Sequence, residues 1–383
     1  MDMINPDRPY QICTRCIMDT TVPTIRFDQN GECNFCEMHD VMEARYPLDE
    51  RGKAELDRLV ADIKKAGEGK KYDVICGTSG GRDSTWTLLL ACKTLGLRPL
   101  AVHFDNGWNS AIAVSNVHNA CEILDIDLET YVADWDEFRD IQHAFLKAST
   151  PDVEVPTDVA IHTVMHKLAV KEGVKYIFNG HSFRTEGIAP KDWTYMDGRY
   201  IRDVQETFGT VPIKDFQNFN LWDYLKFHFI HRVKVVPILN YFPYDKRVVD
   251  KKIQAELGWR NYGGHHHEST YTKFIQSYLL PRKFHVDKRR TENSAMIRSG
   301  YMTREEALDG VKDIYPYDPT LIGYVAEKFN LTVDQFNELV DRPVKSFRDY
   351  KSYYPLIRLM KLPIDIASRL GIIPRLLYLK FLG

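Results

Sequence analysis

Residues 72–84 read Tyr-Asp-Val-Ile-Cys-Gly-Thr-Ser-Gly-Gly-Arg-Asp-Ser, and this stretch decides the fold. Its first five residues predict a short apolar strand, and the residues after the glycines predict a helix. A strand, a Ser/Gly turn and a helix in this order direct backbone N–H groups at one point, which makes an anion site. Gly80 and Gly81 allow close approach of oxygen atoms, while Ser79 and Ser84 add hydroxyl donors.

Asp83 gives this anion site a second function. A carboxylate alone would repel phosphate, so we expect Asp83 to hold Mg²⁺ against phosphate oxygens. No Gly-Lys-Ser/Thr follows the glycines, so the stretch is not a Walker loop, and it is not a G-x-G-x-x-G loop either. The other interpretation is structural: a glycine turn in which Ser84 is an ordinary N-cap.

Strands and helices alternate on both sides of this loop. Helices between strands imply parallel strands joined by right-handed crossovers, so the predicted fold class is α/β with a doubly wound parallel sheet. The carboxyl ends of the strands meet at one edge, where ligands bind in such folds. The strands are expected at residues 72–76, 99–104, 128–133 and 175–179, and the helices at residues 49–67, 85–95, 110–124, 137–147 and 158–172.

Four of the seven cysteines lie within the first 36 residues. Cys13, Cys16, Cys33 and Cys36 form the pattern C-x2-C-x16-C-x2-C, and two such knuckles predict a closed, tetrahedral site of four thiolates for structural zinc. Gly31 suits the turn of a small hairpin. An iron–sulfur cluster and two disulfides are the alternatives. The other three cysteines are expected to be buried small hydrophobic residues.

The composition narrows the class of protein further. The chain has 383 residues, 44% hydrophobic and 27% charged, as in a globular protein of two or three folding units. Its net charge of −2 offers no overall attraction to a polyanion, so we expect no nucleic-acid partner. The N-terminus does not resemble a signal peptide, and no apolar run of about 18 residues occurs. We therefore expect a soluble, cytoplasmic protein.

A second constellation lies far along the chain. Residues 263–269 read Gly-Gly-His-His-His-Glu-Ser and open a predicted helix over residues 270–279. Consecutive side chains on a helix diverge, so three histidines do not ligate one ion there, and a lid with Glu268 on substrate or metal is expected instead. Lys288, Arg289 and the next arginine form a cationic run, which is either a solvated surface or a clamp on departing pyrophosphate.

The loop Ser79-Gly-Gly-Arg-Asp-Ser84 resembles the S-G-G-x-D-S pyrophosphate (PP) loop of the N-type ATP pyrophosphatase superfamily. The resemblance implies an adenine nucleotide alpha hydrolase-like fold and cleavage of ATP between its α- and β-phosphates. A substrate oxygen takes AMP, and a nitrogen or sulfur nucleophile then displaces it. The nucleotide-binding residues are thus expected to be the loop itself and the ends of two strands, namely Val102, His103 and Phe104 by their main chain at the adenine, Asp105 at metal or ribose, and Gly180 and His181.

The ribbon, the loop and the 263–290 segment, in this order, resemble the bacterial N-acetyl sugar amidotransferase family of O-antigen and acidic-sugar biosynthesis. The resemblance implies that an acetamido group on a nucleotide-activated sugar is adenylated with ATP and aminated to an acetamidino group. Amidation of a sugar carboxylate uses the same chemistry and stays open. The resulting segments are a zinc ribbon (1–48), a linker helix (49–69), the PP-loop domain (70–240), a helical substrate and lid region (241–350) and an apolar, basic tail (351–383).

Ammonia is expected to come from another protein. A built-in glutaminase needs a cysteine nucleophile at a processed N-terminus or on an elbow, and none of the seven cysteines has that context. The family resemblance likewise implies a separate glutaminase subunit, in a pair similar to imidazole-glycerol-phosphate synthase. The cofactors implied are ATP, Mg²⁺ and Zn²⁺.

Two alternative functions remain possible, and one segment of the chain has two possible interpretations. A tRNA-modifying thiolation enzyme of the same superfamily also combines zinc ribbons with this loop, and a catalytically dead scaffold would use the ribbon for protein contacts. The segment 354–383 carries five basic residues against Asp365, with Pro363 and Pro374 dividing it. It is either docked on the protein itself or a dimer mate, which is the more frequent arrangement, or it contacts the inner membrane peripherally.

Overall fold

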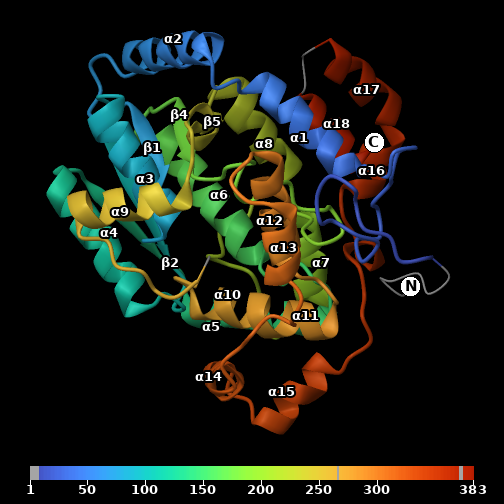
Figure 1. Cartoon of the computed structure of the whole chain (residues 1–383). Helices are drawn as coiled ribbons and strands as arrows, with labels where there is room; N and C mark the ends of the chain where they lie inside the picture. Colours follow the sequence, from blue (N-terminus) through green and yellow to red (C-terminus); the bar gives the residue numbers. More distant parts are fainter. Residues whose placement is uncertain (1–7, 265–266, 371–373) are drawn as a thin grey trace.

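The computed structural model describes residues 8–264, 267–370 and 374–383. Its centre is a sheet of five parallel strands in the order β3-β2-β1-β4-β5, enclosed by helices (Figure 1). The predicted doubly wound parallel sheet is therefore confirmed. The strands are β1 (Val74–Gly77), β2 (Pro99–Asp105), β3 (Leu128–Val132), β4 (Tyr176–Asn179) and β5 (Lys234–Pro237).

Helices cover both faces of this sheet because the strands bury alternate residues on opposite sides. Val74 and Cys76 of β1 belong to the core under α2, α3, α4 and α9, whereas Ile75 belongs to the core under α5 and α6. The helices on the first face are α2 (Glu50–Ala66), α3 (Arg82–Leu89), α4 (Ala111–Leu124) and α9 (Lys246–Leu257), and those on the second are α5 (Trp135–Ala148) and α6 (Val155–Lys171).

A third core joins the two ends of the chain. Cys13 and Phe35, near the N-terminus, are buried in the same cluster as Phe274 and Phe336, so the ribbon and the helical C-terminal region share one interior. The remaining helices are α1 (Asn34–Arg45), α7 (Gly198–Phe208), α8 (Leu221–Leu225), α10 (Thr270–Phe274), α11 (Leu280–Lys283), α12 (Lys288–Arg298), α13 (Arg304–Gly310), α14 (Thr320–Lys328), α15 (Val333–Val340), α16 (Tyr354–Leu359), α17 (Lys361–Arg369) and α18 (Arg375–Phe381).

Several predicted elements differ from the structure in their bounds. The fifth strand, β5, is not among the four predicted strands. Helix α6 begins at Val155 instead of residue 158, because Pro156 occupies its first turn, where a missing N–H costs nothing. The predicted helix over residues 85–95 is α3 followed by a π-helical turn. In the described parts of the chain, no helix is long and apolar enough to cross a membrane.

Candidate active site

The loop between β1 and α3 is fixed by a close approach to α4. Gly80 has a φ of +76°, and a Cβ atom there would lie 2.1 Å from the carbonyl oxygen of Ala113. The Gly80 carbonyl oxygen accepts hydrogen bonds from Asn116 Nδ2 at 3.1 Å and from Trp259 Nε1 at 3.0 Å. Only glycine fits this position, and two buried donors hold its peptide in one orientation.

The two loop serines face each other across the turn. The Ser79 N–H donates to Ser84 Oγ at 3.2 Å, and the Gly81 N–H donates to Ser79 Oγ at 3.2 Å. Ser84 Oγ also donates to the Gly81 carbonyl oxygen at 3.2 Å. The structure therefore brings the predicted loop residues together around the N-terminus of α3, where the helix dipole favours an anion.

Asp83 lies in the first turn of α3, facing the same space. The Tyr244 hydroxyl donates a hydrogen bond to its carboxylate, and Tyr244 is fully buried. Gly180 lies directly opposite: a Cβ atom there would be 3.4 Å from the Asp83 carbonyl group. Asp83 is thus placed between the ends of β1 and β4, which is the switch point of the strand order and the usual ligand position in such sheets.

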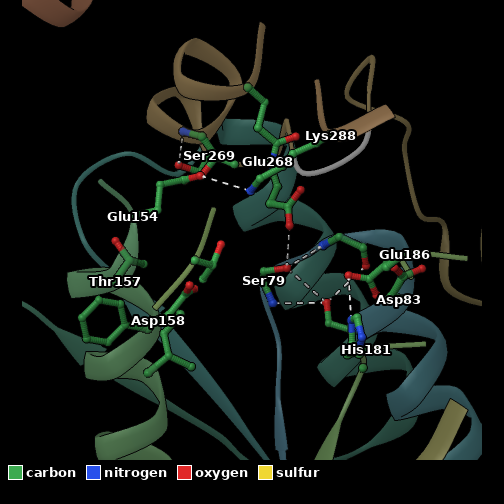
Figure 2. A pocket seen from close by; sticks show the side chains of 18 of the residues that line it. Ser79, Asp83, Glu154, Thr157, Asp158, His181, Glu186, Glu268, Ser269 and Lys288 are labelled. Atoms are coloured by element: carbon green, nitrogen blue, oxygen red, sulfur yellow. Dashed lines mark hydrogen bonds and ion pairs between the residues drawn. The ribbon is translucent and has the colours of Figure 1, made fainter. Parts of the chain in front are cut away.

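A cavity of about 500 Å³ opens in front of this loop. It is lined by the loop, by the ends of β2 and β4, by α6 and by the segment that leads into α10 and α12. Figure 2 shows labelled side chains from the loop, from α6, from the end of β4 and from the segments at α10 and α12 pointing into one space, with Glu268 over Ser79. The polar lining residues include Ser79, Asp83, Glu154, Asp158, His181, Glu186, Glu268 and Lys288.

One wall of the cavity is acidic and was not anticipated from the sequence. Asp152 and Glu154 lie just before α6, and Asp158 lies in its first turn. Lys288 reaches across from α12 to within 3.9 Å of Glu154. Burial raises the pKa of Asp152 to about 6, although the hydroxyl of Tyr200 donates to it at 2.9 Å. The signal was present, since three acids stand within seven residues, but spacing alone does not show that they face inward.

A second, more apolar cavity of about 250 Å³ adjoins the first behind the loop. It is bounded by Val102 and Phe104 of β2, by Ile177 of β4 and by Ile161 and Met165 of α6. The two cavities share Ser79 and Ser84 in their linings. A flat, apolar ring would fit the second cavity while its polar substituent reaches the loop.

Some of the residues expected around the adenine line this cavity, whereas others make structural hydrogen bonds elsewhere. The Val102 carbonyl oxygen is already engaged by the Thr78 N–H at 2.8 Å. His103 is buried on the opposite side of β2, where Nδ1 contacts the Thr78 carbonyl oxygen at 2.9 Å. Asp105 lies outside both linings, because its carboxylate accepts the Gly107 N–H at 2.9 Å and so stabilises the turn after β2.

Gly180 and His181 line the larger cavity at the end of β4. His181 Nδ1 lies 3.1 Å from a carboxylate oxygen of Glu186. Burial is the largest single effect and lowers the pKa of His181, but the charge and hydrogen bond of Glu186, together with the charge of Asp83, raise the pKa above the ordinary value. Glu186 was not predicted as a site residue beyond its place after the strand, and it makes His181 a better proton carrier near neutral pH.

Glu268 is attached to the sheet edge by its main chain. Its carbonyl oxygen accepts the Ser110 N–H at 2.8 Å, and the Thr270 N–H donates to the Trp108 carbonyl oxygen at 2.9 Å. These bonds aim the Glu268 side chain at the loop, where Oε1 accepts a hydrogen bond from Ser79 Oγ at 3.1 Å. The histidine run lies partly beyond this description, because residues 265 and 266 are outside the described residues.

The side chains of the cationic run point in different directions. Lys288 lines the cavity, as expected for a clamp. Arg289 lies outside that lining, because its guanidinium pairs with Asp287 at 2.6 Å and donates to the carbonyl oxygens of Gly310 and Asp313. Successive residues on α12 point about 100° apart, so one side chain of the run reaches the cavity while the next secures the helix. A direct role of Arg289 at pyrophosphate does not agree with this placement.

The four N-terminal cysteines form one cluster. Their sulfur atoms lie within 4.8 Å of one another, and all four side chains are buried. The pKa of Cys13 is strongly lowered, because the other three cysteines hydrogen-bond to its sulfur. Four buried thiols converging on one point, with no carboxylate or histidine among them, fit a tetrahedral zinc ion.

Helix α12 lies against this cluster. The Arg298 guanidinium is 3.7 Å from Cys16 Sγ and 3.8 Å from Cys36 Sγ. Ser294 accepts the Ile17 N–H at 3.2 Å, which ties the first knuckle to the same helix. The cysteine cluster therefore supports the helix whose first residue, Lys288, reaches the cavity.

The strand order, the glycine loop at the switch point and the cavity in front of it define a protein of the PP-loop class. Residues 268–363 match the family model "LPS biosynthesis protein WbpG-like, C-terminal domain". The chain thus combines a PP-loop type of fold with a C-terminal segment that is similar to this lipopolysaccharide biosynthesis family. That domain begins at Glu268, the residue that contacts the loop.

Other known proteins are similar over parts of the chain. An uncharacterized protein of Methanocaldococcus jannaschii, MJ1599, is 28% identical over 171 residues, which cover 44% of this chain and 58% of that protein's length. NMN synthetase from Francisella tularensis gives a TM-score of 0.27 at 14% identity, covering 54% of this chain and 96% of its own. NH3-dependent NAD synthetase from Campylobacter jejuni gives 0.28 at 12% identity, covering 72% and 96%. Similarities this low carry no argument about activity.

Proposed function

We propose that the protein is an ATP-dependent, AMP-forming amidotransferase that acts on a nucleotide-activated sugar. It adenylates an N-acetyl or carboxylate group of the sugar and aminates it with ammonia, in the biosynthesis of lipopolysaccharide O-antigen or a related surface glycan. The observation that carries this proposal is the convergence of the phosphate loop, Asp83, Glu268 and Lys288 on one cavity. The lipopolysaccharide setting is supported by the description of the C-terminal family.

The two cavities accommodate the two substrates. The adenine ring of ATP enters the apolar cavity beside Val102 and Phe104, and the β- and γ-phosphates lie on the loop N–H groups at the start of α3. The sugar then occupies the larger cavity between Lys288 and the acidic wall. An oxygen of the sugar's carbonyl or carboxyl group attacks the α-phosphorus, and the bond to the bridging oxygen of pyrophosphate breaks.

The charged side chains of the cavity are assigned to the charges that develop during this reaction. Lys288 is positioned to offset the negative charge that develops on departing pyrophosphate. Asp83 and Glu268 are the residues that would hold Mg²⁺ beside the loop, and the ion supplies charge neutralisation on the phosphate oxygens. Ammonia next attacks the adenylated carbon, AMP leaves with the electron pair of the C–O bond, and a proton passes from nitrogen to a base of the cavity. We assign that transfer to His181, which is paired with Glu186.

Ammonia is proposed to come from a separate glutaminase subunit. The cysteines outside the ribbon are unsuitable nucleophiles, because burial raises the pKa of Cys92 and Cys121 to about 11 and holds the pKa of Cys76 well above its ordinary value. The purified chain is therefore expected to use ammonium salts and not glutamine, and to gain glutamine-dependent turnover when the partner is added. Glutamine-dependent turnover by the chain alone would refute this part of the proposal.

The decisive experiment is a pyrophosphate-release assay. Purified protein is incubated with ATP, Mg²⁺, ammonium and a panel of nucleotide-linked acetamido and uronic sugars. At least one sugar is expected to stimulate release, and Asp83→Asn is expected to abolish it. Failure of every sugar in the panel, or full activity of the variant, would contradict the proposal.

The alternative of tRNA thiolation is disfavoured by the same cysteines. A sulfur carrier needs a thiolate that forms near neutral pH, and Cys76, Cys92 and Cys121 are held as thiols by burial. Binding of tRNA with a steep salt dependence would nevertheless favour that function over the amidotransferase.

A further inference from the structure

Helix α17 presents an apolar stripe to solvent. Leu362, Ile366 and Leu370 follow one another at intervals of four residues, so they lie on one face of the helix, and they are 75%, 58% and 70% exposed. Leu359, at the end of α16, is 82% exposed and extends the stripe toward the previous helix. We call these four residues the α17 stripe.

The polar face of α17 is turned inward, which reverses the usual arrangement of a surface helix. Ser368 is only 6% exposed and accepts a hydrogen bond from Arg375 of α18 at 3.0 Å. Asp365 pairs with the same arginine at 2.6 Å and with Arg369 at 2.9 Å. The orientation of the stripe is therefore fixed by specific polar contacts to the next helix.

Helix α18 in turn anchors this unit to the body of the protein. Its Leu376 and Leu379 pack against the core that contains the cysteine cluster, and Lys191 donates to the Phe381 carbonyl oxygen at 3.0 Å. Figure 1 shows α17 at the periphery of the molecule, outside α18 and α1. The predicted docking of the tail thus holds for α18, whereas α17 is left with its apolar side outward.

Positive charge surrounds the stripe. Arg358, Lys361 and Arg369 are exposed, and Asp365 is the one acidic residue of segment 354–370, already paired with two arginines. A second copy of the chain docked face to face on the stripe would oppose these bases to their own counterparts, which is unfavourable. An anionic lipid surface offers both an apolar layer for the stripe and phosphates for the bases.

We propose that α16 and α17 form a peripheral membrane-docking surface, in which the α17 stripe enters the interface of an anionic bilayer and the flanking bases contact lipid phosphates. Such a surface lies on the membrane without spanning it. This inference is independent of the proposed catalytic function, because none of its residues lines either cavity.

The test is co-sedimentation of the full chain with vesicles of phosphatidylcholine alone or mixed with phosphatidylglycerol. Binding is expected only to the mixed vesicles and is expected to weaken with salt. The triple variant Leu362→Gln/Ile366→Gln/Leu370→Gln should lower the partition coefficient at least about tenfold. The double variant Arg358→Gln/Lys361→Gln should lower it about fivefold for each charge removed.

A matched control removes equally exposed apolar side chains elsewhere. Phe229 and Ile230 are 75% and 69% exposed, so Phe229→Gln/Ile230→Gln should leave vesicle binding unchanged. The proposal is overturned if the wild-type chain ignores anionic vesicles, or if the control loses binding as much as the triple variant. It is also overturned if light scattering shows a dimer that the triple variant abolishes, since a second copy would then cover the stripe. Circular dichroism confirms that the variants are folded.

Discussion

The Ser79 hydroxyl donates a hydrogen bond of 3.1 Å to the carboxylate of Glu268, across 189 residues of sequence. The bond joins the phosphate loop to the first residue of the WbpG-like domain. A Cβ atom on Gly81 would lie 2.9 Å from the same carboxylate oxygen, so Glu268 lies directly over the loop. In the proposed function, nucleotide binding and the position of the C-terminal domain are therefore coupled at one carboxylate.

Replacing Glu268 by glutamine should separate its charge from its shape. Glutamine can still accept the hydrogen bond from Ser79, but it no longer binds a cation. We expect kcat for pyrophosphate release to fall about 100-fold, with a higher Mg²⁺ concentration needed for half-maximal rate. Glu305→Gln, in the first turn of α13, is the control and should be unchanged. A Glu268→Gln enzyme with normal rate and Mg²⁺ dependence would remove Glu268 from the catalytic group.

Tyr244 is expected to position Asp83. Its hydroxyl bonds the Asp83 carboxylate, and Tyr244→Phe removes that bond without changing the shape of the core. The KM for Mg²⁺-ATP should rise about tenfold while the free energy of unfolding falls by about 1 kcal/mol. Steady-state kinetics and urea denaturation measure the two effects. Equal losses in Tyr224→Phe, which lies in α8, would mean that the change is not specific to Asp83.

The buried guanidinium of Arg184 should be a major contribution to stability. It donates to Glu43 at 2.7 and 3.0 Å, to the Asn240 carbonyl oxygen at 2.7 Å and to the Tyr46 carbonyl oxygen at 2.6 Å. Arg184→Met leaves these acceptors without their donor, so we expect a loss of about 3 kcal/mol in the free energy of unfolding. A loss below about 1 kcal/mol in urea denaturation would show that water replaces the guanidinium at little cost.

The cysteine cluster should bind one zinc ion per chain and support α12. Cys33→Ser is expected to lose the metal, measured by elemental analysis, and to lower the midpoint of thermal unfolding. Activity should fall as well, because Arg298 and Lys288 belong to the same helix. Cys92→Ser, outside the cluster, should keep both metal and stability. Full metal content in Cys33→Ser would place the ion elsewhere.

Asp152 should make the protein less stable as the pH rises. Burial raises its pKa to about 6 in the folded protein, above the value of an unfolded aspartate. The folded state therefore holds its proton more tightly, and this contribution is lost as the pH rises through the folded pKa. Between pH 5 and 7.5, the wild type should lose about 1.4 kcal/mol relative to Asp152→Asn. Parallel pH profiles for the two proteins in urea denaturation would contradict this.

The sequence predicted those parts of the fold that depend on local pattern. The first strand, the glycine turn and the helix after it are contiguous, so residues 72–84 contain the whole signal. The start of α13 is likewise a local feature, because Thr303 and Glu306 lie three residues apart and form a capping box. Strand β5 was missed because it follows a helical, aromatic stretch without a turn signal.

The parts of the site that the sequence did not predict depend on the direction in which each side chain points from its helix. Lys288 and Arg289 are adjacent in the chain, yet one lines the cavity and the other pairs with Asp287. The acidic wall at the start of α6 follows the same rule, because Glu154 and Asp158 face the cavity only through the rotation of the helix. No pattern of residue types reports that rotation without the packing partners.

The contact of Gly80 with Ala113 has a consequence for engineering. A methyl group at position 80 would collide with the α4 backbone, so this part of the chain tolerates no diversification. The opposite side of the cavity includes Thr157 and Asp158 of α6, whose side chains line it. Libraries aimed at new acceptor sugars should therefore randomise these α6 positions and keep both the glycine turn and Lys288 unchanged.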